Sequence, residues 1–384
     1  MNPKLKTAII GCGVVAAKHM KAILHNSDRI ELAAISDIND SAMNTLLKKS
    51  YRNNSLRLSI RQYTDYREML DNEKPDITII TTPAGTHFRI AADALSRGSN
   101  ILLEKPMTLT VSECEQLNNI AAKGNLRIAL GHIYRYFPLV QIIARDLRHG
   151  VFGTPLYGSV NVFWGHGQDY YDKAPWRGTW SQDGGVIMNQ TIHAIDLMSY
   201  FLGGKTTEVS GMTARQTHDM EAEDLGMSII RKDNGTYITV TGTTSSDPSY
   251  PEASFDVLCT EGRIKAGIVS GKPYFRITSR NGFRNKTRKM NFYYIKRYIG
   301  EIVHECGFKW LFRIGNPHSF ILKDLASSII EGSFPVADGA SGEESVRTVI
   351  AIYNSAKFGH TVKLPMSKEI SEEIFNMEIH KSLL

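Results

Sequence analysis

Ile101-Leu102-Leu103-Glu104-Lys105-Pro106 is the stretch of sequence that decides the fold. Apolar residues that stop at Glu-Lys-Pro predict a buried parallel strand, because a strand covered on both faces is apolar throughout and proline cannot continue a sheet. Ligands of open α/β sheets bind at the carboxyl edge of the strands, so Lys105 is placed to meet a substrate. The alternative is an ordinary surface lysine at a strand end.

Length and composition indicate a globular protein of two domains. The chain has 384 residues, of which 42% are hydrophobic and 22% charged, and this length exceeds that of one typical core. The N-terminus has no apolar signal region and no apolar run could span a bilayer, so we expect a cytoplasmic protein. The scattered cysteines form no CxxC pair, which predicts reduced thiols and metal-free catalysis. They are Cys12, Cys114, Cys259 and Cys306.

A glycine turn follows the first apolar stretch, residues 6–10. Gly11-Cys12-Gly13-Val14-Val15-Ala16 has the GxGxxA pattern of dinucleotide-binding turns. The first glycine permits the tight turn, the second lets the backbone approach a pyrophosphate, and Ala16 permits close helix packing. We therefore predict that Gly11, Gly13, Val14 and Val15 bind a dinucleotide cofactor. Glycine used for its conformation alone is the alternative.

An acidic residue ends the second predicted strand, residues 31–35. Asp37 lies 24 positions after Gly13, where a carboxylate can accept hydrogen bonds from the adenosine ribose. A carboxylate repels a 2′-phosphate and no arginine follows closely, so NAD is favoured over NADP. The alternative is that Asp37 only begins a turn.

Strands and helices then alternate as far as residue 130. The helices are predicted at residues 66–70, 87–95 and 111–122, and the strands at 76–81, 101–104 and 127–130. This alternation predicts a doubly wound parallel sheet, an N-terminal Rossmann domain covering residues 1–130. Thr82, Pro83 and His87 belong to a turn at the same sheet edge and could flank the cofactor. A simple loop capped by Thr86 is the alternative.

From residue 131 the pattern becomes rich in strands. We predict strands at residues 156–164, 206–215, 224–231, 236–244, 253–259 and 262–268. They predict an α+β C-terminal domain, residues 131–384, with an open, mainly antiparallel sheet. An exposed sheet face needs a cover, and a homo-oligomer, dimer or tetramer, would supply it.

One predicted helix, residues 185–201, interrupts these strands and carries a polar stripe. Asn189, His193 and Asp196 are spaced i, i+4 and i+7 and therefore share one face. A polar stripe on an apolar helix requires a partner, which could be a substrate. A buried, hydrogen-bonded histidine is the alternative.

These motifs together resemble the Gfo/Idh/MocA family of nicotinamide-dependent sugar oxidoreductases. Four motifs match in order: the glycine turn, Thr82-Pro83 through His87, Glu104-Lys105-Pro106, and the Gly-Gly helix with Asn189 and His193. The resemblance covers nearly the whole chain, to the segment 346–365. Tyr170-Tyr171, residues 176–180 and Met188-Asn189-Gln190 most resemble the branch that acts on UDP-N-acetylglucosaminuronate at C3.

The resemblance implies hydride transfer between a secondary alcohol of a sugar, possibly a nucleotide sugar, and nicotinamide. Lys105 and His193 are the candidates for proton exchange, and the choice of primary base stays open. Many relatives have aspartate where this chain has Asn189, which should orient the substrate or His193. Further implied cofactor contacts are Glu104, Lys105, Trp176 and Arg177. Implied substrate contacts are Arg135, Gln168, Tyr171, Arg177, Asn189, His193 and His318.

The segment 272–313 departs from the family pattern because it is strongly basic. It contains 11 Lys or Arg and two Glu, a net charge of +9 against +6 for the whole chain. Interleaved aromatic residues suggest contact with a substrate phosphate or peripheral contact with an anionic membrane. Nucleic acid is disfavoured because no nucleic-acid-binding motif accompanies the charge. A solvated basic face is the alternative.

Other functions on the same fold are a 3-ketosugar reductase, an inositol dehydrogenase, and a non-catalytic regulator that senses NAD. A basic surface-binding protein is a further class. Lys105 and His193 are both present, which favours an enzyme over a regulator.

Overall fold

A computed structural model describes residues 4–50, 58–279, 287–308 and 316–366. The chain forms two compact units. The first comprises Met1–Thr108, Glu113–Tyr136 and Phe312–Glu343, and the second comprises Leu109–Ser112, Phe137–Leu311 and Glu344–Leu384. The domain boundary at 130/131 remains a prediction.

A six-stranded parallel sheet forms the core of the first unit, in the order β3-β2-β1-β4-β5-β6. β4 is buried at every position, as expected of a central parallel strand covered on both faces. The doubly wound sheet predicted from the sequence is confirmed. Its strands are β1 (Leu5–Ile10), β2 (Ile30–Ser36), β3 (Arg61–Tyr63), β4 (Ile77–Ile80), β5 (Asn100–Leu103) and β6 (Ile128–Leu130).

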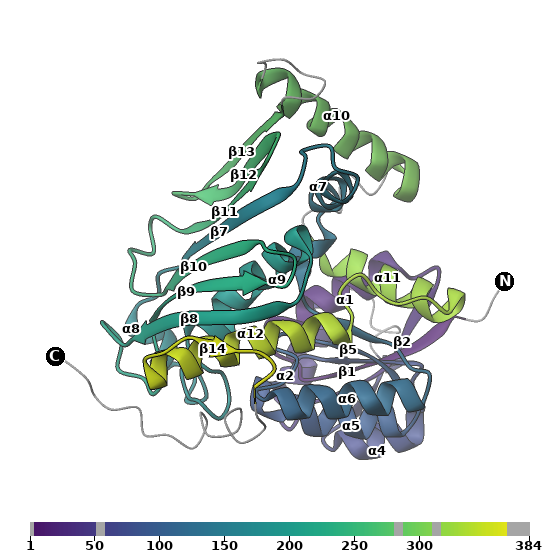
Figure 1. Ribbon diagram of the computed structural model, residues 1–384. Helices are drawn as coiled ribbons and strands as arrows, with labels where there is room; N and C mark the ends of the chain where they lie inside the picture. Colours follow the sequence, from purple (N-terminus) through teal and green to yellow (C-terminus); the bar gives the residue numbers. More distant parts are fainter. Residues whose placement is uncertain (1–3, 51–57, 280–286, 309–315, 367–384) are drawn as a thin grey trace. The chain divides into compact units, whose positions relative to one another are not determined.

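Helices cover both faces of this sheet. Figure 1 shows α4, α5 and α6 on one face and α1 with α11 on the other. α11 belongs to the last quarter of the chain, yet it contacts α1, β5 and β6. The helices are α1 (Ala16–His25), α2 (Asp40–Ser50), α4 (Tyr66–Glu73), α5 (His87–Ser96), α6 (Val111–Lys123) and α11 (His318–Glu331), with 3-10 turns η1 (Ala84–Thr86) and η2 (Ile133–Tyr136).

An eight-stranded sheet forms the second unit, in the order β13-β12-β11-β7-β10-β9-β8-β14. All neighbouring strands are antiparallel except β7 and β10, which are parallel. The predicted mainly antiparallel sheet is therefore confirmed. Its strands are β7 (Pro155–Phe163), β8 (Thr206–Ala214), β9 (Leu225–Lys232), β10 (Tyr237–Thr243), β11 (Glu252–Cys259), β12 (Gly262–Val269), β13 (Lys272–Ser279) and β14 (Val362–Lys363).

Within the described residues, helices cover one face of this sheet and leave the other face open. α9 packs on β7 and β11, and α10 packs on β13 (Figure 1). β9 alternates exposed and buried residues, as a strand with one covered face must. Met212, Met227 and Ile229 are exposed on the open face. The remaining elements are α7 (Pro138–Arg148), α8 (Gln168–Asp172), the π-helical turn η3 (Ile187–Thr191), α9 (Ile192–Leu202), α10 (Thr287–Cys306) and α12 (Gly339–Phe358).

Part of the basic segment 272–313 is regular structure: β13 and α10. Residues 280–286 and 309–315 of this segment lie outside the described residues. Tyr294 of α10 is fully buried, and its hydroxyl donates to Asp146 of α7 at 2.5 Å. Arg297 pairs with the same carboxylate at 2.6 Å. Some of the charge and aromatic content therefore anchors α10. No helix in the described part of the chain is long and apolar enough to cross a membrane.

Candidate active site

The glycine turn after β1 is sterically required at its first position. Gly11 has φ +90°, and a Cβ there would lie 2.9 Å from the Thr81 carbonyl carbon. A Cβ on Gly13 would meet nothing within 4 Å, so the space beside it is open. α1 begins just after Val15 without a side-chain cap, and an uncapped helix N-terminus favours an anion. These features fit a dinucleotide pyrophosphate.

Asp37 closes the same turn from the end of β2. Its Oδ2 accepts the Cys12 N–H at 2.6 Å, and its Oδ1 accepts the Asn39 N–H at 2.9 Å. The carboxylate thus fixes the glycine turn and also begins a turn of its own. Val14 is 83% exposed and Ile38 is 94% exposed, so two apolar side chains flank the turn without burial. This setting fits the adenosine part of NAD.

His87 joins the turns that follow β4 and β5. Its Nδ1 lies 2.8 Å from the Pro106 carbonyl oxygen, and its Nε2 lies 2.9 Å from the Thr82 carbonyl oxygen. Burial lowers the pKa of His87, although both carbonyls favour the charged ring. A neutral ring can donate to only one of them. His87 therefore holds the Thr82-Pro83 turn against the Glu104-Lys105-Pro106 turn.

Glu104 lies in a buried cluster with two histidines from distant parts of the first unit. His19 of α1 is bonded to Glu104 Oε1 at 2.7 Å, and His318 Nε2 of α11 lies 3.7 Å from the same oxygen. Burial opposes ionisation of Glu104, but His19, His318 and Lys105 outweigh it and lower its pKa to about 2. A Cβ on Gly131 would lie 2.6 Å from Glu104 Oε2, so this glycine leaves room for the carboxylate.

In the described part of the chain, the side chains of His19, Glu104 and His318 are arranged as metal ligands could be. Their nitrogen and oxygen atoms lie within 4.8 Å of one another. The hydrogen bond between His19 and Glu104 already joins two of these atoms. Ligating histidines normally donate their second ring N–H, but His19 Nδ1 has no described partner. The geometry favours a hydrogen-bonded cluster that fixes Glu104. Lys105 follows it, partly buried, at the carboxyl end of β5.

In the second unit, the π turn Ile187–Thr191 and α9 carry Asn189 and His193. π turns inside helices occur frequently at functional sites. Asn189 Nδ2 donates to Asp183 Oδ1, and Asp183 Oδ2 accepts the Gly178 N–H at 3.0 Å. Asp183 therefore fixes the orientation of the Asn189 amide. Asp196, the third residue of the predicted stripe, is fully buried and accepts a hydrogen bond from Ser345 Oγ.

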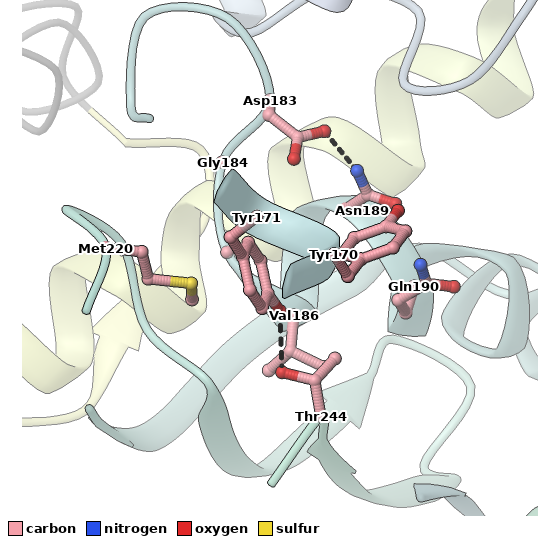
Figure 2. Close-up of a pocket in the computed structure, with 10 residues that line it drawn as sticks. Tyr170, Tyr171, Asp183, Gly184, Val186, Asn189, Gln190, Met220 and Thr244 are labelled. Carbon is pink, nitrogen blue, oxygen red and sulfur yellow. Dashed lines mark hydrogen bonds between the residues drawn. The ribbon is translucent and has the colours of Figure 1, made fainter. Parts of the chain in front are cut away.

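A pocket lies beside this turn (Figure 2). The Tyr171 hydroxyl donates to Thr244 Oγ1 at 2.9 Å. The ring of Tyr170 is stacked on His166, with 3.9 Å between centroids, and the Arg177 guanidinium lies 3.9 Å from the centre of the Tyr170 ring. The lining combines aromatic faces with polar groups. Its residues are Tyr170, Tyr171, Asp183, Gly184, Gly185, Val186, Asn189, Gln190, Met220 and Thr244.

The other residues predicted from the sequence have varied surroundings. Gln168 bonds to the backbone of Asp219, next to the pocket residue Met220. Trp176 is 36% exposed, and Arg177 lies near its ring. Arg135, in the first unit, is buried and donates to the Val336 carbonyl.

Sequence reasoning missed His19 and Asp183, and it named Tyr170 only within a motif. A carboxylate directly before Gly184-Gly185 was the available signal for Asp183. The sequence contains no signal for His19, because its partner Glu104 is 85 residues away.

Comparison with known proteins shows which families share this architecture. Residues 5–132 match a family described as "Oxidoreductase family, NAD-binding Rossmann fold", and residues 140–265 match the "GFO/IDH/MocA C-terminal domain". The chain is 24% identical to D-apiose dehydrogenase of Paraburkholderia graminis, over 74% of this chain and 72% of that protein. It is 32% identical to UDP-N-acetylglucosamine 3-dehydrogenase of Acidithiobacillus ferrooxidans, over 42% and 46% respectively.

A solved structure is similar over almost the full length. The WlbA dehydrogenase of Bordetella pertussis, in complex with NADH and UDP-GlcNAcA, aligns with a TM-score of 0.80 and 26% identity. The alignment covers 96% of this chain and 99% of that one. The resemblance inferred from the sequence motifs is confirmed.

Proposed function

Because the chain belongs to the Gfo/Idh/MocA family of NAD-dependent sugar oxidoreductases, we propose that it transfers a hydride between C3 of a UDP-linked amino sugar or its uronate and nicotinamide. The observation that carries this proposal is the near-complete structural likeness to a dehydrogenase that holds NADH and UDP-GlcNAcA. The side chains beside Asn189 are aromatic and polar, the kinds that line ligand sites, and the cavity between them, about 10 Å³, has room for one water molecule.

We propose that the turn after β1 and Asp37 hold the cofactor. The open space at Gly13 and the uncapped start of α1 would bind the pyrophosphate. Asp37 would accept hydrogen bonds from the ribose and disfavour a 2′-phosphate. When bound, NAD supplies the hydride acceptor. Thr82 and Pro83 remain proposed cofactor contacts because their turn lies at the carboxyl edge of the sheet, and Glu104, Trp176 and Arg177 remain so because of the resemblance.

Proton exchange at the reacting hydroxyl is assigned to Lys105 and His193. Lys105 extends from the carboxyl end of β5, beside the ionised Glu104. His193 follows Asn189 by four residues on the helix of the second unit. An amide cannot exchange a proton near neutral pH, so Asn189, held by Asp183, would orient the substrate or His193.

Five further substrate contacts are proposed from the resemblance. Tyr171 lines the pocket, and Arg177 and Gln168 contact residues that line it or lie next to it. Arg135 and His318 are buried in the first unit and already bonded there, so their assignment comes from the resemblance alone. The group is Arg135, Gln168, Tyr171, Arg177 and His318.

A screen of substrates with NAD tests the proposal. We would measure NADH fluorescence at enzyme concentrations comparable with substrate, so that one turnover is visible even if NADH stays bound. UDP-N-acetylglucosaminuronate or UDP-N-acetylglucosamine should give a signal, and apiose and inositols should not. Lys105→Met and His193→Asn serve as inactive controls. Reduction of NAD by a free inositol alone would contradict the nucleotide-sugar assignment.

Two interactions with partners are also proposed. Met212 and Met227 are paired across β8 and β9 and exposed, so the open sheet face would be covered by a second copy of the chain. The exposed side of α10 carries an apolar row spaced i, i+3, i+7 and i+11, next to the basic sequence of the segment 272–313. This row would contact an anionic membrane. Its members are Phe292, Ile295, Ile299 and Val303.

A further inference from the structure

The helix that carries Asn189 begins without a capping side chain of its own. Its first N–H groups require acceptors, but the residues before it are Gly184 and Gly185, and the turn has no side-chain cap. The acceptors come from two distant positions. Val186 N–H donates to the Glu223 carbonyl and Ile187 N–H to Glu223 Oε1, both at 2.9 Å, and Met188 N–H donates to the Tyr353 hydroxyl at 3.1 Å.

Glu223 and Tyr353 also bond to each other. The Tyr353 hydroxyl donates to Glu223 Oε1 at 2.9 Å, so Met188, Tyr353 and Glu223 form a continuous chain of hydrogen bonds. Both side chains are buried, with 2% and 4% of their surface exposed. The first intrahelical bond follows at once, from Asn189 N–H to the Gly185 carbonyl at 2.9 Å.

The position of Glu223 requires glycine before the helix. A Cβ on Gly185 would lie 1.8 Å from Glu223 Oε2, and Gly184 has φ +75°. No side chain other than hydrogen fits at residue 185 while Glu223 occupies its place. The Gly-Gly pair therefore leaves room for the Glu223 carboxyl group, which precedes β9, to reach the N-terminus of the helix.

We propose that Glu223 and Tyr353 are positioning residues, a buried carboxyl–phenol pair that caps the helix from outside and thereby fixes Asn189 and His193 for the reaction. This inference rests on the proposed function for its catalytic consequence. The capping itself does not depend on the substrate. Burial raises the pKa of Glu223 to about 8, so the carboxyl group is mainly neutral near pH 7, and glutamine is its isosteric replacement.

Hydrogen exchange tests the capping without a substrate. Glu223→Leu removes the acceptor of Ile187, and Tyr353→Phe removes the acceptor of Met188. Loss of a buried hydrogen-bond partner should raise local exchange at residues 186–189 by about tenfold or more. Glu223→Gln should leave exchange near the wild-type rate. Tyr250→Phe, at a tyrosine that is 64% exposed, is the matched control.

Kinetics test the consequence for the reaction. Glu223→Leu and Tyr353→Phe should lower kcat by about tenfold or more while NADH affinity stays unchanged, because misplaced groups on the helix weaken the transition state. Glu223→Gln should recover most of the turnover. If Glu223→Leu does not fold, the kcat of Tyr353→Phe tests the proposal by itself.

Different results would overturn the capping role and the proposed function. Unchanged exchange at residues 186–189 in both variants, or a glutamine variant as impaired as leucine, would overturn the role of Glu223 and Tyr353. Absence of wild-type turnover with every sugar would instead overturn the proposed function, and the exchange experiment would still test the capping.

Discussion

Replacing Glu223 with glutamine should flatten the pH dependence of the protein's stability between weakly acidic and weakly alkaline pH. Burial raises the pKa of Glu223 from 4.5 to about 8 in the folded chain. The unfolded chain therefore loses this proton near pH 4.5, whereas the folded chain keeps it until about pH 8. Between these values the folded state binds one proton more, so the free energy of unfolding falls as pH rises.

The magnitude follows from the size of the shift. The interval from 4.5 to 8 is 3.5 pKa units, and about 1.4 kcal/mol per unit sets an upper limit of about 5 kcal/mol. Between about pH 5.5 and pH 8 we expect a loss of about 3 kcal/mol from this one group. Tyr353 and Asp224 face Glu223, but the pKa of Tyr353 is raised and that of Asp224 is lowered. Neither changes its charge in this interval.

Urea unfolding at several pH values provides the assay. Trp180 is a local probe, because its ring is buried and lies 5.2 Å from the ring of Tyr353. The wild-type free energy of unfolding should fall with pH more steeply than that of Glu223→Gln, with Tyr250→Phe following the wild type. Equal slopes for wild type and Glu223→Gln would refute the reasoning, since Glu223 would then hold no extra proton in the folded state.

Three further predictions concern the proposed site and the basic segment. Lys105→Met should lower kcat by about two orders of magnitude or more while NADH binding, measured by calorimetry, is retained; undiminished turnover would remove Lys105 from the mechanism. Asp37→Ala should narrow the preference for NAD(H) over NADP(H) in the same calorimetric measurement, and a wild-type protein without that preference would contradict the assignment. Neutralising four basic residues should abolish salt-sensitive binding to anionic liposomes or raise KM for a phosphorylated substrate, and Tm should not fall. If neither liposome binding nor KM changes, the segment is a solvated surface. These four are Arg284, Lys286, Arg288 and Lys289, of which the first two lie outside the described residues.

Local sequence determined most elements of both sheets, whereas β3, β13 and β14 were not predicted from it. The apolar run 101–103 and the turn at Gly11 encode burial and backbone conformation over a few residues, which is the range that periodicity reports. For this reason the Rossmann unit, the antiparallel sheet and the placement of Lys105 at a strand end followed from the sequence.

Only the tertiary structure decided which distant side chains complete the site. His19 and His318 meet at Glu104 although they are 299 residues apart, and Glu223 meets Tyr353 across 130 residues. The π turn at Ile187–Thr191 depends on these outside acceptors, because its own sequence offers no cap. Buried polar groups must find partners wherever the fold brings them, and no local pattern encodes a partner so far along the chain.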